Sequence, residues 1–192
     1  MIRLANKGDV SQILAIYRPY ILNTCITFET EVPSEQAFLE RFETITARYP
    51  WIVWEEKGKI LGYAYGDRAF ARAAYDWDAD LSIYLSEDAR GMGLGGKLYG
   101  CLEALLARQG YHNLYALVTG ENERSCRFHE HHGYERFGVQ KDTGWKHGRW
   151  HDVIWYAKRL CPAEDPGPSP KAFVCGEEER KLMERFSCRE SK

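Results

Sequence analysis

A glycine-rich turn between a strand pattern and a helix pattern constrains this chain more than any other feature. It has the sequence Arg-Gly-Met-Gly-Leu-Gly-Gly-Lys at residues 90–97 and follows a strand pattern that ends at Leu85. Glycine permits the positive φ angles of a tight turn, and the first backbone N–H groups of a helix lie at the positive end of its dipole. The turn therefore predicts an anion site, and phosphate is the natural guest.

Three phosphate-binding motifs fit this turn to different degrees, beside the simpler interpretation that glycine serves only the turn geometry. Residues 91–96 match G-x-G-x-x-G, but that motif should follow the first strand of a fold and precede an acidic residue at the end of the next one. A triphosphate loop needs a Ser or Thr where this chain has Leu98. The third motif is the pyrophosphate loop R-x-x-G-x-G, formed by Arg90, Gly93 and Gly95.

A second motif follows the turn at a spacing typical of one large family. Residues 122–134 resemble the N-x-x-A-x-x-F-Y-x-x-x-G-F helix of the GNAT acetyltransferases, with Ser125 in place of alanine and His129 in place of tyrosine. Over about residues 2–158 the chain is similar to the phosphinothricin and methionine sulfoximine N-acetyltransferases. The matching segments are residues 28–31, 49–51, 74–77, 128–134 and 146–153. The resemblance implies acetyl transfer from acetyl-CoA to the amine of a small amino-acid-like substrate, by a homodimer.

The hydrophobic pattern predicts an α/β fold with a mixed, mostly antiparallel sheet and one central strand-helix-strand crossover. Helices are expected from Asp9 to Ile21, where Asp9 can cap the helix and Pro19 bend or shorten it, from Ser34 to before Pro50, and at 95–109 and 123–132. Strands are expected at 2–4, 51–55, 60–65, 79–85, 114–118, 134–139 and 151–157. The resemblance adds the GNAT fold, with splayed central strands and flanking helices.

Proline content divides the chain near residue 160. Four prolines lie in residues 161–170, which is typical of a linker. We therefore expect an N-acetyltransferase domain at 1–160, a Pro-rich linker at 161–176, and a short helix or mobile tail at 177–192.

Composition disfavours several classes of function. The 26 basic and 28 acidic residues give a net charge of −2, so no charge excess favours nucleic acid or a membrane surface. No window approaches the roughly 18 apolar residues of a membrane span, and the N-terminus is not a signal sequence, so a soluble cytoplasmic protein is expected. The six cysteines form no C-x-x-C pair, and we expect no metal.

Acetyl transfer to an amine needs a proton acceptor, because an amine with a pKa near ~10 is almost fully protonated at pH 7. Asp80 stands where the resembling enzymes carry a catalytic glutamate, with Asp78 as the alternative; either could instead be a solvated strand-edge carboxylate. His129 stands where many family members place the tyrosine that protonates the leaving thiolate, and the resembling subfamily also has histidine there. Its ordinary pKa near ~6.5 suits proton transfer in both directions, although a helix-surface histidine is the alternative. We expect direct attack of the amine on the thioester, with Cys126 as a packing residue.

The resemblance also assigns binding residues. In this family the strand that ends at Leu85 separates from its neighbour, which leaves backbone N–H groups for the developing oxyanion and a passage for the pantetheine arm. The expected acetyl-CoA contacts are Ile83, Tyr84, Leu85, Arg90, Gly91, Met92, Gly93, Leu94, Gly95, Gly96, Asn122 and Ser125. The expected substrate contacts are Phe28, Arg72, Tyr75 and Val153. Arg72 is expected to bind a carboxylate and Phe28 to form an aromatic lid.

Two other functions stay open on the sequence alone. The acceptor could be another amine, such as a polyamine, an antibiotic or a protein N-terminus. The chain could also be a non-catalytic acyl-CoA-binding sensor, because Asp80 is one methylene shorter than the glutamate of the resembling enzymes.

Overall fold

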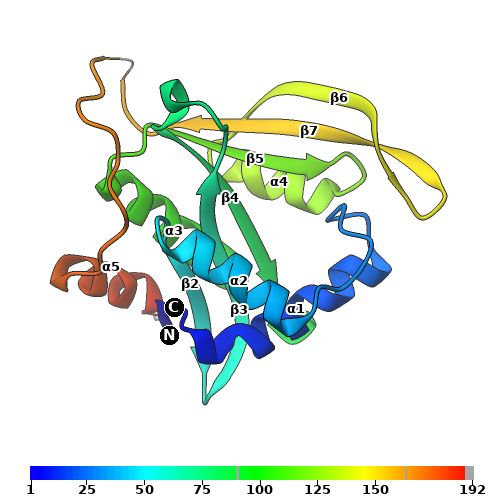
Figure 1. The fold of residues 1–192 in the computed structure, drawn as a ribbon, viewed down its shortest axis with the longest axis horizontal. Helices are drawn as coiled ribbons and strands as arrows, with labels where there is room; N and C mark the ends of the chain where they lie inside the picture. Colours follow the sequence, from blue (N-terminus) through cyan, green and yellow to red (C-terminus); the bar gives the residue numbers. More distant parts are fainter. Residues whose placement is uncertain (90, 163, 189–192) are drawn as a thin grey trace.

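The computed structural model describes residues 1–89, 91–162 and 164–188. Seven strands form one sheet in the order β1-β2-β3-β4-β5-β7-β6 (Figure 1). The strands are β1 (Ile2–Leu4), β2 (Trp51–Glu56), β3 (Lys59–Arg68), β4 (Asp78–Leu85), β5 (Asn113–Thr119), β6 (Glu135–Lys146) and β7 (Arg149–Arg159). The α-helices are α1 (Val10–Asn23), α2 (Glu35–Thr46), α3 (Leu94–Gln109), α4 (Glu123–His131) and α5 (Glu177–Ser187). The predicted α/β architecture is confirmed.

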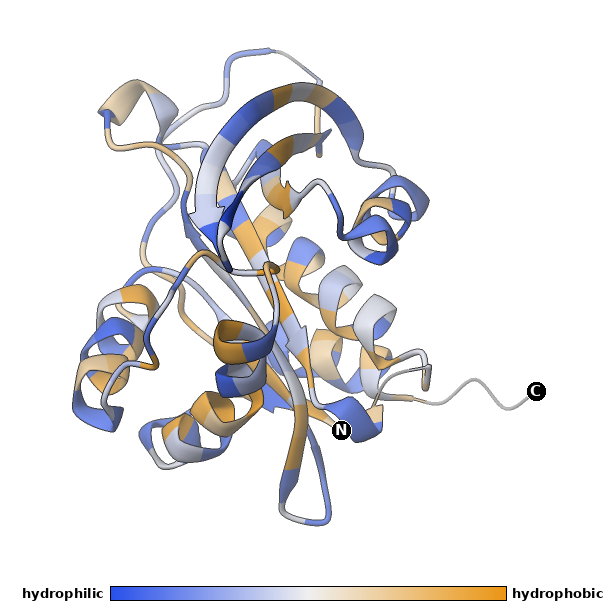
Figure 2. Ribbon diagram, turned by 90° about the vertical axis from the view of Figure 1, so that its right-hand side faces the viewer, coloured by the Kyte–Doolittle hydropathy of each residue, from blue (hydrophilic) through white to orange (hydrophobic). Residues whose placement is uncertain are grey.

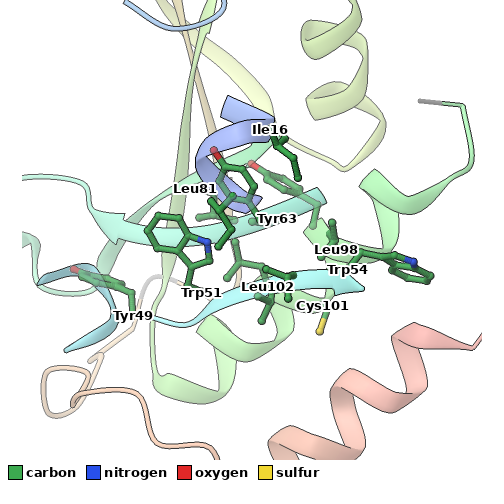
Figure 3. Close-up of a cluster of buried hydrophobic side chains, with 14 of the residues drawn as sticks. Ile16, Tyr49, Trp51, Trp54, Tyr63, Leu81, Leu98, Cys101 and Leu102 are labelled. Atoms are coloured by element: carbon green, nitrogen blue, oxygen red, sulfur yellow. The ribbon is translucent and has the colours of Figure 1, made fainter. Parts of the chain in front are cut away.

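The core lies on both faces of the central strands, because successive side chains of a strand point to opposite faces. On one face Tyr65 of β3 stacks on Trp51 of β2, with ring centroids 4.1 Å apart. On the other face Gly66 lies against the Leu106 side chain of α3. Figure 3 shows aromatic and aliphatic side chains of this core, including Tyr63 and Leu102.

The central strands β4 and β5 run parallel and are paired only at their beginnings, whereas the other neighbouring pairs are antiparallel. The last register partners of the parallel pair are Asp80 and Tyr115. Beyond them β4 stays with β3 up to Leu85, while β5 stays with β7 up to Thr119. The strands therefore separate in the middle of the sheet, as the family resemblance implied.

The β6–β7 hairpin is longer than its hydrophobic pattern predicts. Its turn is His147-Gly148, where both residues have positive φ angles of 48° and 76°. The register shifts between Gln140 and Gly144, where polar residues conceal the strand alternation. Figure 1 shows the hairpin reaching past β5 toward the connection between α1 and α2, and Figure 2 shows it as a mostly hydrophilic arch.

Two expectations for the first helix need correction. Asp9 occupies the N-cap position of α1 but makes no side-chain cap hydrogen bond. Its carboxylate accepts instead from the Asn6 backbone N–H at 2.8 Å and pairs with Arg3 at 2.7 Å. Pro19 lies inside α1, which continues to Asn23.

The C-terminal helix α5 packs against α3 and β1. Met183 is 5% exposed, and the Phe186 ring lies against Gly100 of α3. The backbone N–H of Ile2 donates to the Ser187 hydroxyl at 2.6 Å, and Lys97 donates to the Cys188 carbonyl at 2.5 Å. The described part of the tail therefore docks on the body. None of the helices in the described ranges is long and apolar enough to cross a membrane.

Candidate active site

The glycine-rich turn forms an open backbone cradle at the start of α3. Gly91 and Gly93 have φ angles of 81° and 74°, and among the described residues no atom beyond the adjoining backbone lies within 4 Å of a Cβ added to either. Gly93 is the N-cap of α3 and has no side chain that could occupy the first N–H groups of the helix. The cradle thus offers backbone donors and the positive end of the helix dipole, a combination that fits the pyrophosphate of CoA. Arg90, which was also predicted to bind acetyl-CoA, lies outside the described residues.

The other predicted cradle residues differ in what they can offer. Leu94 is buried, so only its backbone can face a ligand, whereas the Met92 side chain is exposed. Gly95 is packed beside Phe128 of α4 and Leu85 of β4. Gly96 lies against the His132 ring. Close packing of α3 on β4 and α4 therefore needs small residues here.

The end of β4 provides a backbone edge at the strand separation. Ile83, Tyr84 and Leu85 pair with β3 on one side and have no β5 partner on the other. The Tyr84 ring packs against Tyr17 with centroids 4.8 Å apart, so its side chain belongs to the core. The free strand edge is the part of these residues that suits a thioester and its developing oxyanion.

Asp80 lies at the point where the strands separate. Its side chain is partly buried, and its Oδ1 atom is sealed from solvent with no hydrogen-bond partner. Burial, assisted by the negative charge of Asp67, raises the pKa of Asp80 to about 7, while a smaller backbone hydrogen bond from Leu81 acts in the opposite direction. A carboxyl group with a pKa near 7 can accept and return a proton at neutral pH. The alternative, Asp78, accepts a hydrogen bond from the Asn113 amide at 2.8 Å.

His129 is also buried, but both of its ring nitrogens are engaged. The ring is 4% exposed, and Nδ1 donates to the Ser125 carbonyl at 2.8 Å. In the neutral ring Nε2 then accepts from the Tyr99 hydroxyl, 3.0 Å away. Burial lowers the pKa of His129 to about 4. His129 is therefore a neutral, hydrogen-bonded core residue.

Tyr99 contacts His129 and is close enough to Asp80 for the Asp80 charge to affect its pKa. It is fully buried in α3, and burial together with the nearby charges of Asp80 and Glu103 raises its pKa well above the ordinary value. The hydroxyl therefore stays protonated and serves as the donor to His129.

Asn122 and Ser125 organise the start of α4. The Asn122 side chain accepts from the Ser125 backbone N–H at 3.2 Å and caps the helix. The Ser125 hydroxyl lies 3.3 Å from Nδ1 of His129. Both predicted CoA-binding residues thus have intramolecular partners, and Asn122 keeps its amide N–H donors for other contacts.

Two of the predicted substrate residues gather where the α1–α2 connection meets the β6–β7 hairpin. The exposed Phe28 ring lies directly on Gly144, where an added Cβ would clash with it. Val153 is buried in β7, and its register partner Thr119 donates to the Cys25 carbonyl at 2.5 Å. The loop carrying Phe28 is therefore attached to the sheet near Val153.

The other two predicted substrate residues, Arg72 and Tyr75, lie in the exposed β3–β4 connection, at the opposite end of β4 from the cradle. The Tyr75 ring packs against Phe70 at 4.8 Å, and Phe70 packs against Tyr115, the register partner of Asp80. Tyr75 is thus linked to the Asp80 region through one aromatic ring. The described structure gives Arg72 no comparable link, and its side chain is exposed.

Sequence reasoning missed two charged residues on the Asp80 face of the sheet. Asp67 is the register partner of Asp80 across β3 and β4. Arg41 of α2 pairs with Glu29 at 2.5 Å and is close enough to Asp67 to favour its ionised form. Glu29 was noted within the segment 28–31, but only the tertiary structure brings it to Arg41.

The fold, the strand separation and the cradle define an acyl-CoA-dependent acyltransferase architecture. The family model for the acetyltransferase (GNAT) domain matches residues 2–155. The chain belongs to the GNAT acetyltransferase family and is an acetyl-CoA-dependent N-acetyltransferase. The predicted family resemblance is thereby confirmed.

Two enzymes and one solved structure are similar to this chain over most of its length. The chain is 36% identical to the phosphinothricin N-acetyltransferase of Streptomyces viridochromogenes over 84% of this chain and 89% of that protein. It is also 36% identical to the L-methionine sulfoximine/L-methionine sulfone acetyltransferase of Pseudomonas aeruginosa over 84% and 95% of the two chains. The crystal structure of a Sinorhizobium meliloti phosphinothricin acetyltransferase in complex with AcCoA superimposes with a TM-score of 0.82 at 36% identity, over 89% and 97% of the two chains.

Proposed function

We propose that this protein acetylates the primary amine of a small amino acid of the phosphinothricin or methionine sulfoximine type, with Asp80 as the proton acceptor. One observation carries the proposal: a carboxyl oxygen without a hydrogen-bond partner is held where the central strands separate. A buried polar atom without a partner is costly, so such an atom is a strong candidate for a ligand contact. The similarity to enzymes named for these substrates supports the substrate class.

The chain's own residues can perform the steps that acetyl transfer requires. Acetyl-CoA supplies the acetyl thioester when bound. The Asp80 carboxylate takes a proton from the acceptor ammonium group, which leaves a neutral amine. The new C–N bond forms as the C–S bond of the thioester breaks, the second proton lost by the nitrogen goes to the departing CoA thiolate, and Asp80 releases its proton to solvent. Backbone N–H groups at the end of β4 stabilise the negative charge on the carbonyl oxygen, and the cradle at residues 91–96 binds the pyrophosphate.

For His129 we propose a role through Tyr99. The neutral imidazole holds the Tyr99 hydroxyl in place, within reach of the Asp80 charge. Direct contact of His129 with the substrate is disfavoured because both ring nitrogens have partners within the protein.

For the acceptor we propose that Phe28 and Val153 contact its side chain. On the family resemblance we propose that Arg72 of the separate β3–β4 connection, with Tyr75 beside it, binds its carboxylate. An aromatic ring and a branched aliphatic side chain suit an amino-acid side chain, and a guanidinium group suits its carboxylate.

A homodimer is part of the proposal, on the family resemblance. Trp145 and Trp150 are 56% and 54% exposed near the hairpin turn, with ring centroids 5.3 Å apart. A second copy of the chain would remove these rings from water. Sedimentation velocity at micromolar concentration tests this assembly.

A substrate panel tests the function. The full chain is incubated with acetyl-CoA and, in separate reactions, phosphinothricin, methionine sulfoximine, other amino acids, a polyamine and a peptide, and release of the CoA thiol is followed. We expect the highest kcat/KM with one of the amino acids. Preference for the polyamine or the peptide would reject amino acids as the substrate class. Tight CoA binding without thiol release for any amine would favour a non-catalytic acyl-CoA-binding sensor.

A further inference from the structure

Asp67 and Asp80 form a carboxylate pair across two strands. They are register partners in the antiparallel β3–β4 pair, so their side chains point to the same face of the sheet. The Cβ atoms of directly opposed residues are roughly 5 Å apart, and like charges in such positions repel. The protein therefore places a second negative charge directly beside the proposed proton acceptor.

The surroundings of the two carboxyl groups differ. The Arg68 backbone N–H donates to Oδ1 of Asp67 at 2.7 Å, and the positive charge of Arg41 also favours the Asp67 anion, although burial raises its pKa. Asp80 has only a weak interaction with the Leu81 backbone N–H, the smallest of the influences on its pKa, and its Oδ1 atom has no hydrogen-bond partner. When two interacting carboxyl groups have unequal support, the less supported one retains the proton. Asp67 is therefore the fixed anion of the pair, and Asp80 is the group that titrates.

Other titratable groups near the pair come from every element that packs around it. They are Tyr17 of α1, Arg41 of α2, Tyr49 just before β2, Tyr65 of β3, Asp78 of β4, Tyr99 of α3, Tyr115 of β5 and, beyond Arg41, Glu29. Burial raises the pKa of each of these five tyrosines, so they are neutral at physiological pH. Glu29 offsets part of the Arg41 charge through their ion pair. Asp67, directly opposite Asp80 in the strand register, is the charged group that raises the pKa of Asp80.

We propose that Asp67 is a positioning residue of the acetyltransferase: its negative charge holds the proton affinity of Asp80 at the value that general-base catalysis needs. This inference rests on the proposed role of Asp80. Removal of the Asp67 charge makes Asp80 a weaker base that stays ionised to lower pH. The enzyme should then gain relative activity at acidic pH and lose maximal activity.

The direct test is the titration of Asp80 in the ligand-free protein, followed by the carboxyl ¹³C NMR signal and assigned with Asp80→Asn. In Asp67→Asn the midpoint should fall by about one pH unit, the order expected for like charges roughly 5 Å apart. Asp67→Ser, a second neutral variant, should lower the midpoint of the Asp80 titration by a similar amount. The midpoint should stay near the wild-type value in Asp67→Glu, which keeps the charge. It should also stay there in the surface control Glu43→Gln, which removes a charge that pairs with Lys7.

The kinetic test is the pH profile of kcat/KM for the best acceptor from the panel. The acidic limb should move to lower pH in Asp67→Asn by the same amount as the NMR midpoint. An unmoved midpoint, or a uniform loss of activity with an unmoved limb, would overturn the inference. Full activity of Asp80→Asn would instead reject Asp80 as the base, while the NMR midpoint would still decide whether Asp67 acts on Asp80.

Discussion

Asp80 and His129 are two buried titratable side chains that both act on Tyr99, and the protein treats them in opposite ways. His129 gives one ring nitrogen to a carbonyl and the other to a hydroxyl, and burial lowers its pKa to about 4. Asp80 keeps one oxygen without a partner, and burial with a neighbouring anion raises its pKa to about 7. His129 is thus fixed in one protonation state at neutral pH, whereas Asp80 changes state there.

His129 thus has the properties of a structural polar group, and Asp80 has those of a reactive one. A satisfied hydrogen-bond network stabilises a core and specifies its packing. An unsatisfied oxygen costs free energy, and the fold retains it where a ligand can complete its contacts. The same rule applies to the cradle at residues 91–96, whose open backbone donors have no side-chain cap.

The largest effect should come from Asp80→Asn. We expect kcat/KM to fall at least a hundredfold, because the variant cannot take the proton of the acceptor amine. Steady-state kinetics with the best acceptor measure this loss. Asp78→Asn is the matched control, since Asp78 lies on the same face of β4 but bonds to Asn113. A comparable loss of kcat/KM in Asp78→Asn would contradict the assignment of Asp80, rather than Asp78, as the proton acceptor.

Stability of the same variant should change with pH in a defined direction. The raised pKa of Asp80 means that its contribution to stability is present below about pH 4 and is lost as the pH rises through about 7. Asp80→Asn lacks this loss, so the variant should gain stability relative to the wild type across that interval. Denaturant unfolding at pH 4, 6 and 8 measures the gain.

His129→Asn should mainly affect stability. We expect the free energy of unfolding to fall by about 2 kcal/mol at pH 7.5, because a void forms and the Tyr99 hydroxyl loses its partner. The lowered pKa means that this contribution is present above about pH 6.5 and declines as the pH falls toward 4. The acidic limb of the kcat/KM profile should stay in place. A hundredfold loss of kcat/KM with a shifted limb would instead make His129 a direct acid-base group.

The smallest effect should come from the cradle. Gly93→Val should weaken acetyl-CoA binding about tenfold, since a side chain would enter the open space above the donors and the left-handed φ would be strained. Gly58→Val carries similar strain, with a φ of 79° in the β2–β3 turn, and should leave affinity unchanged. Isothermal titration calorimetry compares the two variants. Equal affinities for both would remove the cradle from the binding site.

Much of the candidate site was predictable because its signals are local in the chain. The cradle needs only glycines between a strand and a helix, and the second motif lies on one helix. Asp67 was not predictable in the same way. Its position opposite Asp80 depends on the register of β3 against β4, which residues 69–77 connect without a tight turn to fix that register. The length of the β6–β7 hairpin was missed because its polar middle hides the alternation.

Motifs and periodicities within short segments were enough to predict the family, the order of the elements and the anion cradle. Which buried groups have hydrogen-bond partners depends on contacts between distant segments and became clear only from the folded structure. Asp80 and His129 are equally plausible acid-base residues in the sequence, but their pKa values depend on burial and on partners that other segments supply, such as Asp67 from β3 and Tyr99 from α3. Proton affinity at a site is a property of the packed surroundings, and those exist only after the chain has folded.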